Sequence, residues 1–328
     1  MTDLPTEMTV IEHGAGGGPE VLVPGRRPVP VPAPHEVMVK VTAAGVNGPD
    51  LVQRRGHYPP PKGASDLLGL EVSGEVVAKG ADVTRWQVGD RLCALTNGGG
   101  YAEYVAIDAA HCLAIPDGVS ETDAAGLCET HFTVWSNLFH EARVPEGGLL
   151  LVHGGAGGIG STAIQMGVAR GMRVFATEAE GGLAFCRDLG AERAIDYRAE
   201  DFVALTREAG GADLILDIIG GETVAKNIKA ARHDCRIVQL AFNAGSEVTL
   251  NLMPVMLKRL VYTGSTLRSR PEVFKAAVAR ALEAKIWPLF ATGGMRAVTH
   301  TVLPLAEAAQ AHTLMEAAGH QGKILLTP

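Results

Sequence analysis

Five glycines between positions 154 and 160 are the feature of the chain most suited to chemistry. They follow the apolar run 149–152 and precede a helical pattern that opens at Ile159. Gly155, Gly157 and Gly160 have the G-x-G-x-x-G spacing, in which glycines allow a tight turn, close approach of a pyrophosphate and packing of helix on strand. Because a helix N-terminus also presents unpaired N–H groups to phosphates, the pattern predicts a dinucleotide site. The alternative is a glycine-rich turn without a ligand.

The elements around this loop match a Rossmann unit. The run 149–152 is typical of a buried strand in a parallel sheet covered on both faces. The helix predicted over 159–170 stops at Gly171, a residue type that commonly ends helices. A second strand over 172–177 leads to Glu178, and an acidic side chain in this place binds the adenosine ribose hydroxyls of a dinucleotide. This context favours a ligand-binding loop.

Strand and helix patterns alternate through the rest of this half of the chain. Strands are predicted over 193–196, 212–219, 236–242 and 261–266, and helices over 200–208 and 222–231. Alternation of this kind produces right-handed crossovers and a parallel sheet. Together with the two strands above, these complete a six-stranded sheet by Thr266.

The first part of the chain, to about residue 125, has a different pattern. Strands are expected over 37–41, 69–77, 90–95 and 101–107, and prolines between positions 28 and 34 predict an extended lead-in. At the other end, helices are expected over 271–284 and 305–318 and strands over 298–302 and 323–327. Since the nucleotide sheet is already complete, we expect these last elements to return to the first domain.

Composition limits the classes of function. The 328 residues are enough for two buried cores, and 47% are hydrophobic. No apolar run approaches the roughly 20 residues of a membrane span, and no signal peptide is recognisable. The net charge of −7 argues against a nucleic-acid partner held by electrostatics. The five cysteines form no C-x-x-C pair, which favours reduced thiols in a cytoplasmic protein.

Motifs spread over most of the chain point to a family. They occupy residues 44–50, 56–61, 68–74, 88–91, 98–104, 152–160, 189–191, 195–197 and 322–326. Through them the chain resembles the medium-chain dehydrogenase/reductase superfamily, and within it the zinc-independent quinone oxidoreductase branch that includes zeta-crystallin. The resemblance implies an α/β fold with a GroES-like β-barrel domain and a Rossmann domain with a doubly wound, parallel six-stranded sheet. The first is expected to comprise residues 1–125 completed by 268–328, and the second residues 126–267.

The resemblance also bears on metal chemistry. Zinc alcohol dehydrogenases of the superfamily hold catalytic zinc through a cysteine and a histidine, whose places are taken here by Asn47 and Leu70. Since neither can serve as such a ligand, and the four-cysteine structural lobe is missing, we expect no metal. Alcohol oxidation then lacks a group to stabilise the alkoxide. Hydride addition to a quinone or conjugated enone instead gives a delocalised anion.

The expected function is therefore NAD(P)H-dependent reduction of a quinone or related conjugated carbonyl, as in an NADPH:quinone oxidoreductase. The alternative enzyme is an enoyl or alkenal double-bond reductase, which would differ in the shape of its substrate pocket. Outside enzymes, zeta-crystallin relatives are structural or RNA-binding proteins, but no basic stripe supports RNA binding here. The family implies a homodimer, because the strand over 261–266 would leave an exposed sheet edge that a partner covers.

By resemblance, three residues near the start of the chain line the cleft beside the nicotinamide. Asn47 is expected to bond the ribose or amide of the cofactor, or else to form a turn. Asp50 is a candidate catalytic residue, with the alternative that it is the N-cap of a helix near Leu51. Tyr58 offers a ring for stacking and a hydroxyl for proton donation. A second aromatic residue, often present in this loop of the family, is replaced by Val52.

Further cofactor contacts are expected along the chain. Thr133 matches a threonine that packs near the nicotinamide, although an ordinary helical residue would look the same. The remaining expected contacts are Gly155, Gly157, Gly158, Ile159, Glu178, Tyr197, Phe242, Asn243 and Leu267. The family's NADP-binding members carry a lysine after the second strand, where this chain is acidic, but Tyr197 matches a tyrosine that lies against the adenosine phosphate. The expected cofactor is NADPH, with NADH as the alternative that Glu178 favours.

Overall fold

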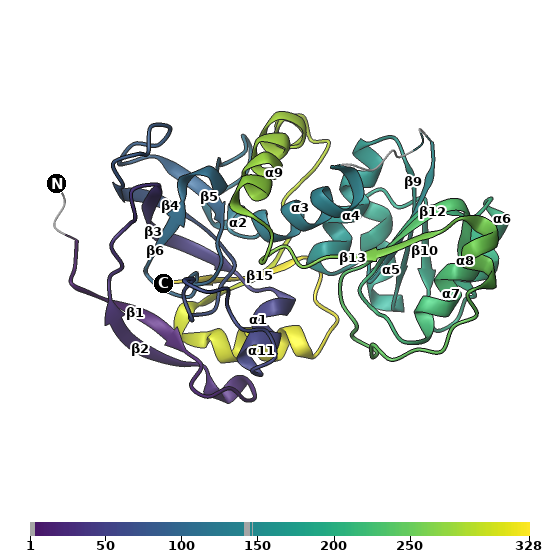
Figure 1. The fold of residues 1–328 in the computed structure, drawn as a ribbon, viewed down its shortest axis with the longest axis horizontal. Helices are drawn as coiled ribbons and strands as arrows, with labels where there is room; N and C mark the ends of the chain where they lie inside the picture. Colours follow the sequence, from purple (N-terminus) through teal and green to yellow (C-terminus); the bar gives the residue numbers. More distant parts are fainter. Residues whose placement is uncertain (1–3, 141–144, 146) are drawn as a thin grey trace. The chain divides into compact units, whose positions relative to one another are not determined.

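The chain forms two compact units. The computed structural model describes residues 4–140, 145 and 147–328. Met1–Phe132 and Arg268–Pro328 together make unit 1, and Thr133–Leu267 make unit 2 (Figure 1). No helix in the described ranges is both long and apolar enough to cross a membrane.

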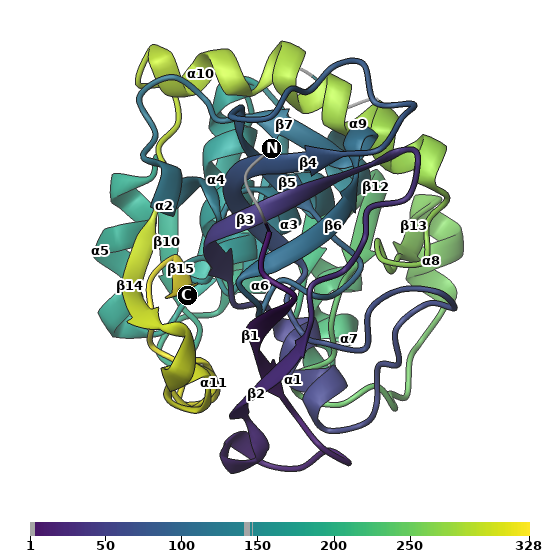
Figure 2. The same cartoon turned by 90° about the vertical axis from the view of Figure 1, so that its left-hand side faces the viewer.

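Unit 1 is built on a seven-stranded sheet. Its strands are β3 (Glu36–Gly45), β4 (Glu71–Lys79), β5 (Arg91–Leu95), β6 (Tyr104–Asp108), β7 (Cys112–Ala114), β14 (Thr299–Pro304) and β15 (Lys323–Thr327). They are hydrogen-bonded in the order β14-β15-β3-β4-β5-β7, and β6 pairs with β3. Because β15 pairs with β3 at Ala44 and Gly45, segments from both ends of the sequence share one sheet (Figure 2).

Helices and a hairpin complete unit 1. The helices are α1 (Gly48–Arg54), α2 (Glu121–Ala124), α9 (Glu272–Lys285), α10 (Trp287–Ala291) and α11 (Ala308–Glu316), with 3-10 turns η1 (Pro19–Val21), η2 (Ala109–His111) and η4 (Leu305–Glu307). β1 (Glu7–Glu12) and β2 (Val23–Pro28) pair as an antiparallel hairpin. The sequence analysis predicted no strands over 7–12 and 23–28, and its extended lead-in covered only 28–34, so the hairpin was missed. A two-stranded sheet tolerates Pro24 and Pro28, because edge strands need not donate every backbone N–H.

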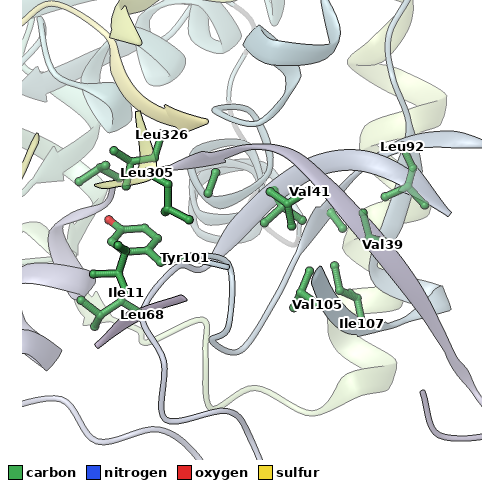
Figure 3. Close-up of a cluster of buried hydrophobic side chains, with 14 of the residues drawn as sticks. Ile11, Val39, Val41, Leu68, Leu92, Tyr101, Val105, Ile107, Leu305 and Leu326 are labelled. Carbon is green, nitrogen blue, oxygen red and sulfur yellow. The ribbon is translucent and has the colours of Figure 1, made fainter. Parts of the chain in front are cut away.

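The core of unit 1 draws on distant parts of the chain. Figure 3 shows the ring of Tyr101 among Ile11, Leu68, Leu305 and Leu326, all of them buried. The C-terminal leucines complete an apolar core begun by residues of the first third of the chain. Burial of this kind contributes about 25 cal/mol per Å² of apolar surface, so the C-terminal segment is an integral part of the unit.

Unit 2 contains the predicted Rossmann sheet. Its strands are β8 (Leu149–His153), β9 (Arg173–Glu178), β10 (Arg193–Asp196), β11 (Ala212–Asp217), β12 (Ala231–Gln239) and β13 (Val261–Gly264). Its helices are α4 (Gly158–Ala169), α5 (Glu180–Asp188), α6 (Phe202–Glu208), α7 (Glu222–Ala230) and α8 (Met253–Lys258). The chain enters unit 2 through α3 (Cys128–Val134) and the π-helix η3 (Trp135–Phe139). The strand order β10-β9-β8-β11-β12-β13 is parallel throughout, which confirms the predicted fold class.

The strand order determines where a ligand belongs in unit 2. β8 lies between β9 and β11, and all five of its residues are buried. The sequence proceeds outward from β8 in one direction and from β11 in the other, so the order reverses between these two strands. Ligands of open α/β sheets bind at the carboxyl ends of the strands at this switch point, and there the glycine-rich loop follows β8.

Candidate active site

The glycine-rich loop connects β8 to α4, and most of its glycines are required by packing. Gly154 has a φ of +72°, which favours glycine. A Cβ at Gly155 would lie 2.7 Å from the Cys186 sulfur, and one at Gly160 would lie 2.1 Å from the Gly154 carbonyl oxygen. Gly157 is different, since a Cβ there would meet only that carbonyl oxygen, at 3.9 Å. Protein packing therefore leaves open space in front of Gly157.

The first turn of α4 faces this space without a side-chain cap. α4 has 12 residues, and its N-cap is Gly157, which has no side chain to bond the first N–H groups. Gly158 and Ile159 begin the helix. Free N–H groups and the helix dipole make such a terminus an anion site. An open glycine beside an uncapped helix start fits the pyrophosphate of a dinucleotide.

Glu178 ends β9 and turns toward the loop. Its two carboxylate oxygens accept hydrogen bonds of 2.9 Å from the backbone N–H groups of Ala156 and Ala179. Gly182 makes room for this conformation, because a Cβ there would lie 2.4 Å from the Glu178 Cγ. The sequence did not single out Gly182. Its role emerges only from the approach of α5 to the end of β9.

Tyr197 follows β10, the next strand of the sheet. β10 pairs with β9 so that Asp196 lies opposite Glu178, and the Tyr197 N–H donates to the Glu178 carbonyl oxygen. Tyr197 is 52% exposed. The Arg198 guanidinium lies 5.4 Å from the centre of its ring, and its Nε donates to the Tyr197 hydroxyl oxygen at 3.3 Å. The structure thus brings Glu178, Tyr197 and a cation to one edge of the sheet.

A buried polar network supports the same edge. The His153 Nε2 lies 2.7 Å from the Asn227 Oδ1, and the Asn227 Nδ2 donates to the Asp217 carboxylate at 2.8 Å. Asp217 also accepts the N–H groups of Ile219 and Gly220. Since an amide oxygen only accepts, Nε2 of His153 carries the hydrogen. The network, which the sequence did not reveal, fixes the ends of β8 and β11.

The other predicted contacts of unit 2 lie on separate elements. Thr133 is buried in α3, and its carbonyl oxygen accepts from Asn137 at 2.9 Å. Phe242 is 45% exposed after β12, and the Asn243 N–H reaches the Ile218 carbonyl oxygen at 3.4 Å. Leu267 is buried. Phe242 and Asn243 thus follow the carboxyl end of β12, whereas no hydrogen bond among the described residues links Thr133 or Leu267 to the glycine loop.

In unit 1, Asn47 belongs to a buried charged network. Its Nδ2 donates to the Glu71 carboxylate at 2.9 Å, and its Oδ1 accepts from the Lys323 ammonium at 2.6 Å. Lys323 and Glu71 form an ion pair of 2.7 Å. Both charged side chains are almost fully buried, where an unpaired charge would be costly. The sequence singled out only Asn47 of this group.

Asp50 stabilises the start of α1, but not as the N-cap we considered. Asn47 is the N-cap, and the Asp50 carboxylate reaches back to the Asn47 N–H at 2.9 Å. Asp50 occupies the third helical position because α1 begins at Gly48, earlier than expected. Its other oxygen accepts the Gly69 N–H. Burial raises the pKa of Asp50 to about 6 despite these bonds.

Tyr58 lies beside a buried arginine. The Arg268 guanidinium is 5.5 Å from the centre of the Tyr58 ring, and Arg268 also donates to the Gln53 side chain and to the Asn97 carbonyl oxygen. Burial raises the pKa of Tyr58, and the charge of Glu129 raises it further. Tyr58 is therefore a neutral phenol at physiological pH, next to a fixed cation.

Tyr101 belongs to a hydrogen-bonded chain in the core of unit 1. The fully buried Tyr101 has its hydroxyl 3.0 Å from His312 Nε2, and His312 Nδ1 lies 3.1 Å from an Arg54 nitrogen. Because Arg54 only donates, Nδ1 accepts and Nε2 carries the hydrogen. Burial lowers the pKa of His312 to about 3. A neutral histidine with one defined tautomer thus holds Tyr101 in place.

Comparison with known proteins identifies the family. Residues 33–117 match the alcohol dehydrogenase GroES-like domain, and residues 158–283 match the zinc-binding dehydrogenase domain. The quinone oxidoreductase of Mus musculus is 30% identical over 319 residues, covering 94% of this chain and 95% of the relative. The chain belongs to the quinone oxidoreductase branch of the medium-chain dehydrogenase/reductase superfamily.

Other members of the superfamily share the whole fold. The Escherichia coli quinone oxidoreductase complexed with NADPH superposes with a TM-score of 0.86 at 27% identity, covering 98% of this chain and 100% of that chain. A mycocerosic acid synthase-like polyketide synthase of Mycobacterium tuberculosis is 32% identical over 300 residues, or 90% of this chain. The chain spans only 14% of the length of that synthase.

The residues of this quinone oxidoreductase homologue do not fit the catalytic zinc site expected of zinc-dependent members of the superfamily. Leu70 is buried and apolar, and the Asn47 oxygen is already bonded to the Lys323 ammonium. The positive charge of Lys323 at that point repels a zinc ion. Among the described residues, Asp108, His111 and Glu272 do approach one another as potential ligands, but Glu272 already pairs with His111 and lies 3.7 Å from the Lys275 ammonium.

Proposed function

We propose that the chain is an NADPH-dependent, zinc-independent reductase that transfers a hydride to a quinone or a related conjugated carbonyl. The observation that carries the proposal is the open space at Gly157, the one motif glycine that packing does not require. The ammonium of Lys323 at Asn47 supports the metal-free part of the proposal. The quinone oxidoreductases of the family, one of them solved with NADPH, support the cofactor and the acceptor class.

The cofactor would be held mainly by backbone groups of unit 2. Gly155, Gly157, Gly158 and Ile159 would hold the pyrophosphate at the start of α4. Thr133, Phe242, Asn243 and Leu267 are proposed to contact the nicotinamide half. When bound, NADPH supplies the hydride. The protein orients the acceptor and excludes water, which is most of what hydride addition to a delocalised acceptor requires.

Recognition of the 2′-phosphate is proposed for Tyr197 and Arg198. The guanidinium of Arg198 lies over the Tyr197 ring and supplies the cation that an NADP site needs. Glu178 opposes this preference, because its carboxylate lies at the neighbouring strand end. Both Glu178 oxygens are engaged by backbone N–H groups, which offsets part of the negative charge. We therefore propose NADPH as the preferred cofactor, with NADH accepted more weakly.

Enoyl reduction is the second candidate reaction. The 32% identity to a polyketide synthase, higher than the 30% to the mouse quinone oxidoreductase, shows that similar sequences also occur in proteins not named as quinone oxidoreductases, and this keeps the second reaction open. Both reactions add a hydride to an acceptor whose charge is delocalised onto oxygen. They differ in the carbon that accepts the hydride and in the basicity of the resulting anion.

The acceptor class can be tested with purified protein and a panel of quinones, alkenals and enoyl thioesters, each with NADPH and with NADH. The proposal expects the highest kcat/KM for a quinone with NADPH. A preference for enoyl thioesters would favour the second reaction. Tight RNA binding without turnover of any acceptor would contradict both and favour a zeta-crystallin-like binding role.

We also propose a homodimer formed through the edge of the unit 2 sheet. β13 is the last strand of the sheet, and large apolar side chains near it are 43% to 66% exposed: Leu252, Met253, Met256, Leu257, Val261 and Tyr262. An apolar patch beside an unpaired strand edge is typical of an interface.

A cytoplasmic location is proposed as well. All five cysteines are free and buried, which supports a cytoplasmic location.

A further inference from the structure

Glu129 is a glutamate in the first turn of α3 whose carboxylate has no partner in the part of the chain that the structure describes. Its backbone N–H donates to the Glu71 carboxylate at 2.8 Å. Its own side chain makes no hydrogen bond or ion pair with the described residues, although the residue is partly buried. A carboxylate in such surroundings normally accepts several hydrogen bonds. Glu129 therefore keeps its hydrogen-bonding capacity free.

The charges around Glu129 come from several elements of unit 1. They belong to Glu71 on β4, Asp50 on α1, Lys323 on β15, Lys275 on α9, Arg268 and the phenol of Tyr58. Burial and the negative charge of Glu71 disfavour the ionised form, and Lys323 opposes them. The pKa of Glu129 consequently rises to about 8. At neutral pH the carboxyl group is mostly protonated and can donate its proton.

We propose that Glu129 is the proton donor for the reduced acceptor, in the electrostatic surroundings it shares with Tyr58 and Arg268. This inference rests on the proposed reductase function. Lys323 and Arg268 already have other protein partners. The carboxyl group of Glu129 has no hydrogen-bond partner among the described residues, and it is a suitable acid to protonate the reduced acceptor. Tyr58, whose pKa is raised, is the weaker acid and serves to orient the acceptor.

The step balances as a simple reduction. The acceptor gains a hydride at carbon, and an electron pair moves onto its carbonyl oxygen. The O–H bond of Glu129 breaks as an O–H bond forms on that oxygen, and the Glu129 carboxylate then takes a proton from water. Over the cycle one NADPH and one proton are consumed, and NADP⁺ and the reduced acceptor are released.

Two measurements test this proposal, one of them without cofactor. In protein carrying 13C-labelled glutamate, NMR titration of the cofactor-free chain is expected to show one carboxyl group titrating near pH 8, and Glu129→Gln is expected to remove that signal. In steady-state assays with NADPH, wild-type kcat is expected to fall as pH rises through about 8, since the acid must be protonated. Glu129→Gln should lower kcat about 100-fold, the low end of the ~10²–10⁴ range of general acid catalysis, and abolish that fall.

Glu121→Gln is the matched control, since Glu121 begins the neighbouring short helix α2 but is held by Thr42 and Arg91. It should leave kcat and its pH profile unchanged. Glu129→Asp, which keeps the acid, should retain more activity than Glu129→Gln. A Glu129 that titrates below pH 6, or a Glu129→Gln enzyme with the wild-type pH profile, would overturn the proposal while the reductase function stands. Wild-type protein inactive toward every acceptor would overturn both.

Discussion

At the scale of single residues, Glu178 is the side chain on which cofactor choice depends. It ends the strand beside the glycine loop and is bonded to Ala156 within that loop. A phosphate on the adenosine ribose would meet this negative charge, whereas a free 2′-hydroxyl would donate to it. Arg198, stacked on Tyr197, acts in the opposite sense. The balance between these two charges is an energetic question that substitution can measure.

Glu178→Gln should shift preference toward NADPH. If the repulsion is about 1.4 kcal/mol, the ratio of kcat/KM for NADPH to that for NADH rises roughly tenfold. The matched control is Glu180→Gln, which removes a neighbouring exposed charge in the first turn of α5 and should change the ratio much less. Steady-state kinetics with both cofactors provide the measurement. An unchanged ratio in Glu178→Gln would remove Glu178 from the cofactor site.

Residue chemistry was only partly accessible from the sequence. The motif containing Asn47 marked it as a site residue, but its partner Lys323 is 276 positions away. Pairing over that distance depends on β15 joining β3, which no local pattern reveals. For the same reason Glu129 went unnoticed, since its surroundings are assembled from four different elements. Gly182 likewise acquires meaning only from the packing of α5 beside Glu178.

At the scale of elements, the turn from β8 to α4 contains glycines that packing requires and one glycine that packing does not require. Gly160 lies so close to the Gly154 carbonyl oxygen that no side chain fits. Gly157 adopts a φ of −69° that any residue tolerates, and space lies beside it. The glycine at position 157 thus leaves space that a ligand can fill.

Alanine substitutions at Gly157 and Gly160 should affect different properties: NADPH binding in the first case and stability in the second. The free energy of unfolding of Gly157→Ala is expected to lie within about 1 kcal/mol of the wild-type value. The variant should bind NADPH at least tenfold more weakly, because its Cβ fills the space of the pyrophosphate. Gly160→Ala is expected to lose about 3 kcal/mol of folding free energy through steric overlap. Denaturant unfolding and calorimetric titration with NADPH provide the two readouts. Normal NADPH affinity in Gly157→Ala would contradict the assignment of the loop.

Elements with a regular apolar pattern were predictable, and those without one were not. The six strands of unit 2 were expected because buried strands alternate with amphipathic helices. β12, however, begins at Ala231 rather than near 236, since its first part carries exposed Arg232, His233 and Asp234 and shows no apolar pattern. The β1–β2 hairpin was missed because β2 contains two prolines and few buried residues.

At the scale of the whole molecule, the exposed edge of unit 2 predicts assembly. Replacing both Met256 and Leu257 by lysine should leave the fold intact and shift the protein from dimer to monomer at micromolar concentration, because charge is costly to bury in an interface. Val273→Lys, a change at an equally exposed apolar residue on α9, is the control and should not alter the mass. Sedimentation or light scattering measures the outcome. A wild-type monomer under these conditions would contradict the dimer.

The central claim, reduction of a conjugated acceptor by NADPH without zinc, is tested most directly by one assay. Purified protein is treated with a strong chelator, and the oxidation of NADPH is followed with a simple 1,4-benzoquinone before and after treatment. We predict quinone-dependent NADPH oxidation at the same rate in both samples, because Asn47 and Leu70 do not provide zinc ligands and Lys323 holds a positive charge beside Asn47. Activity that collapses on chelation and returns with added zinc would contradict the account.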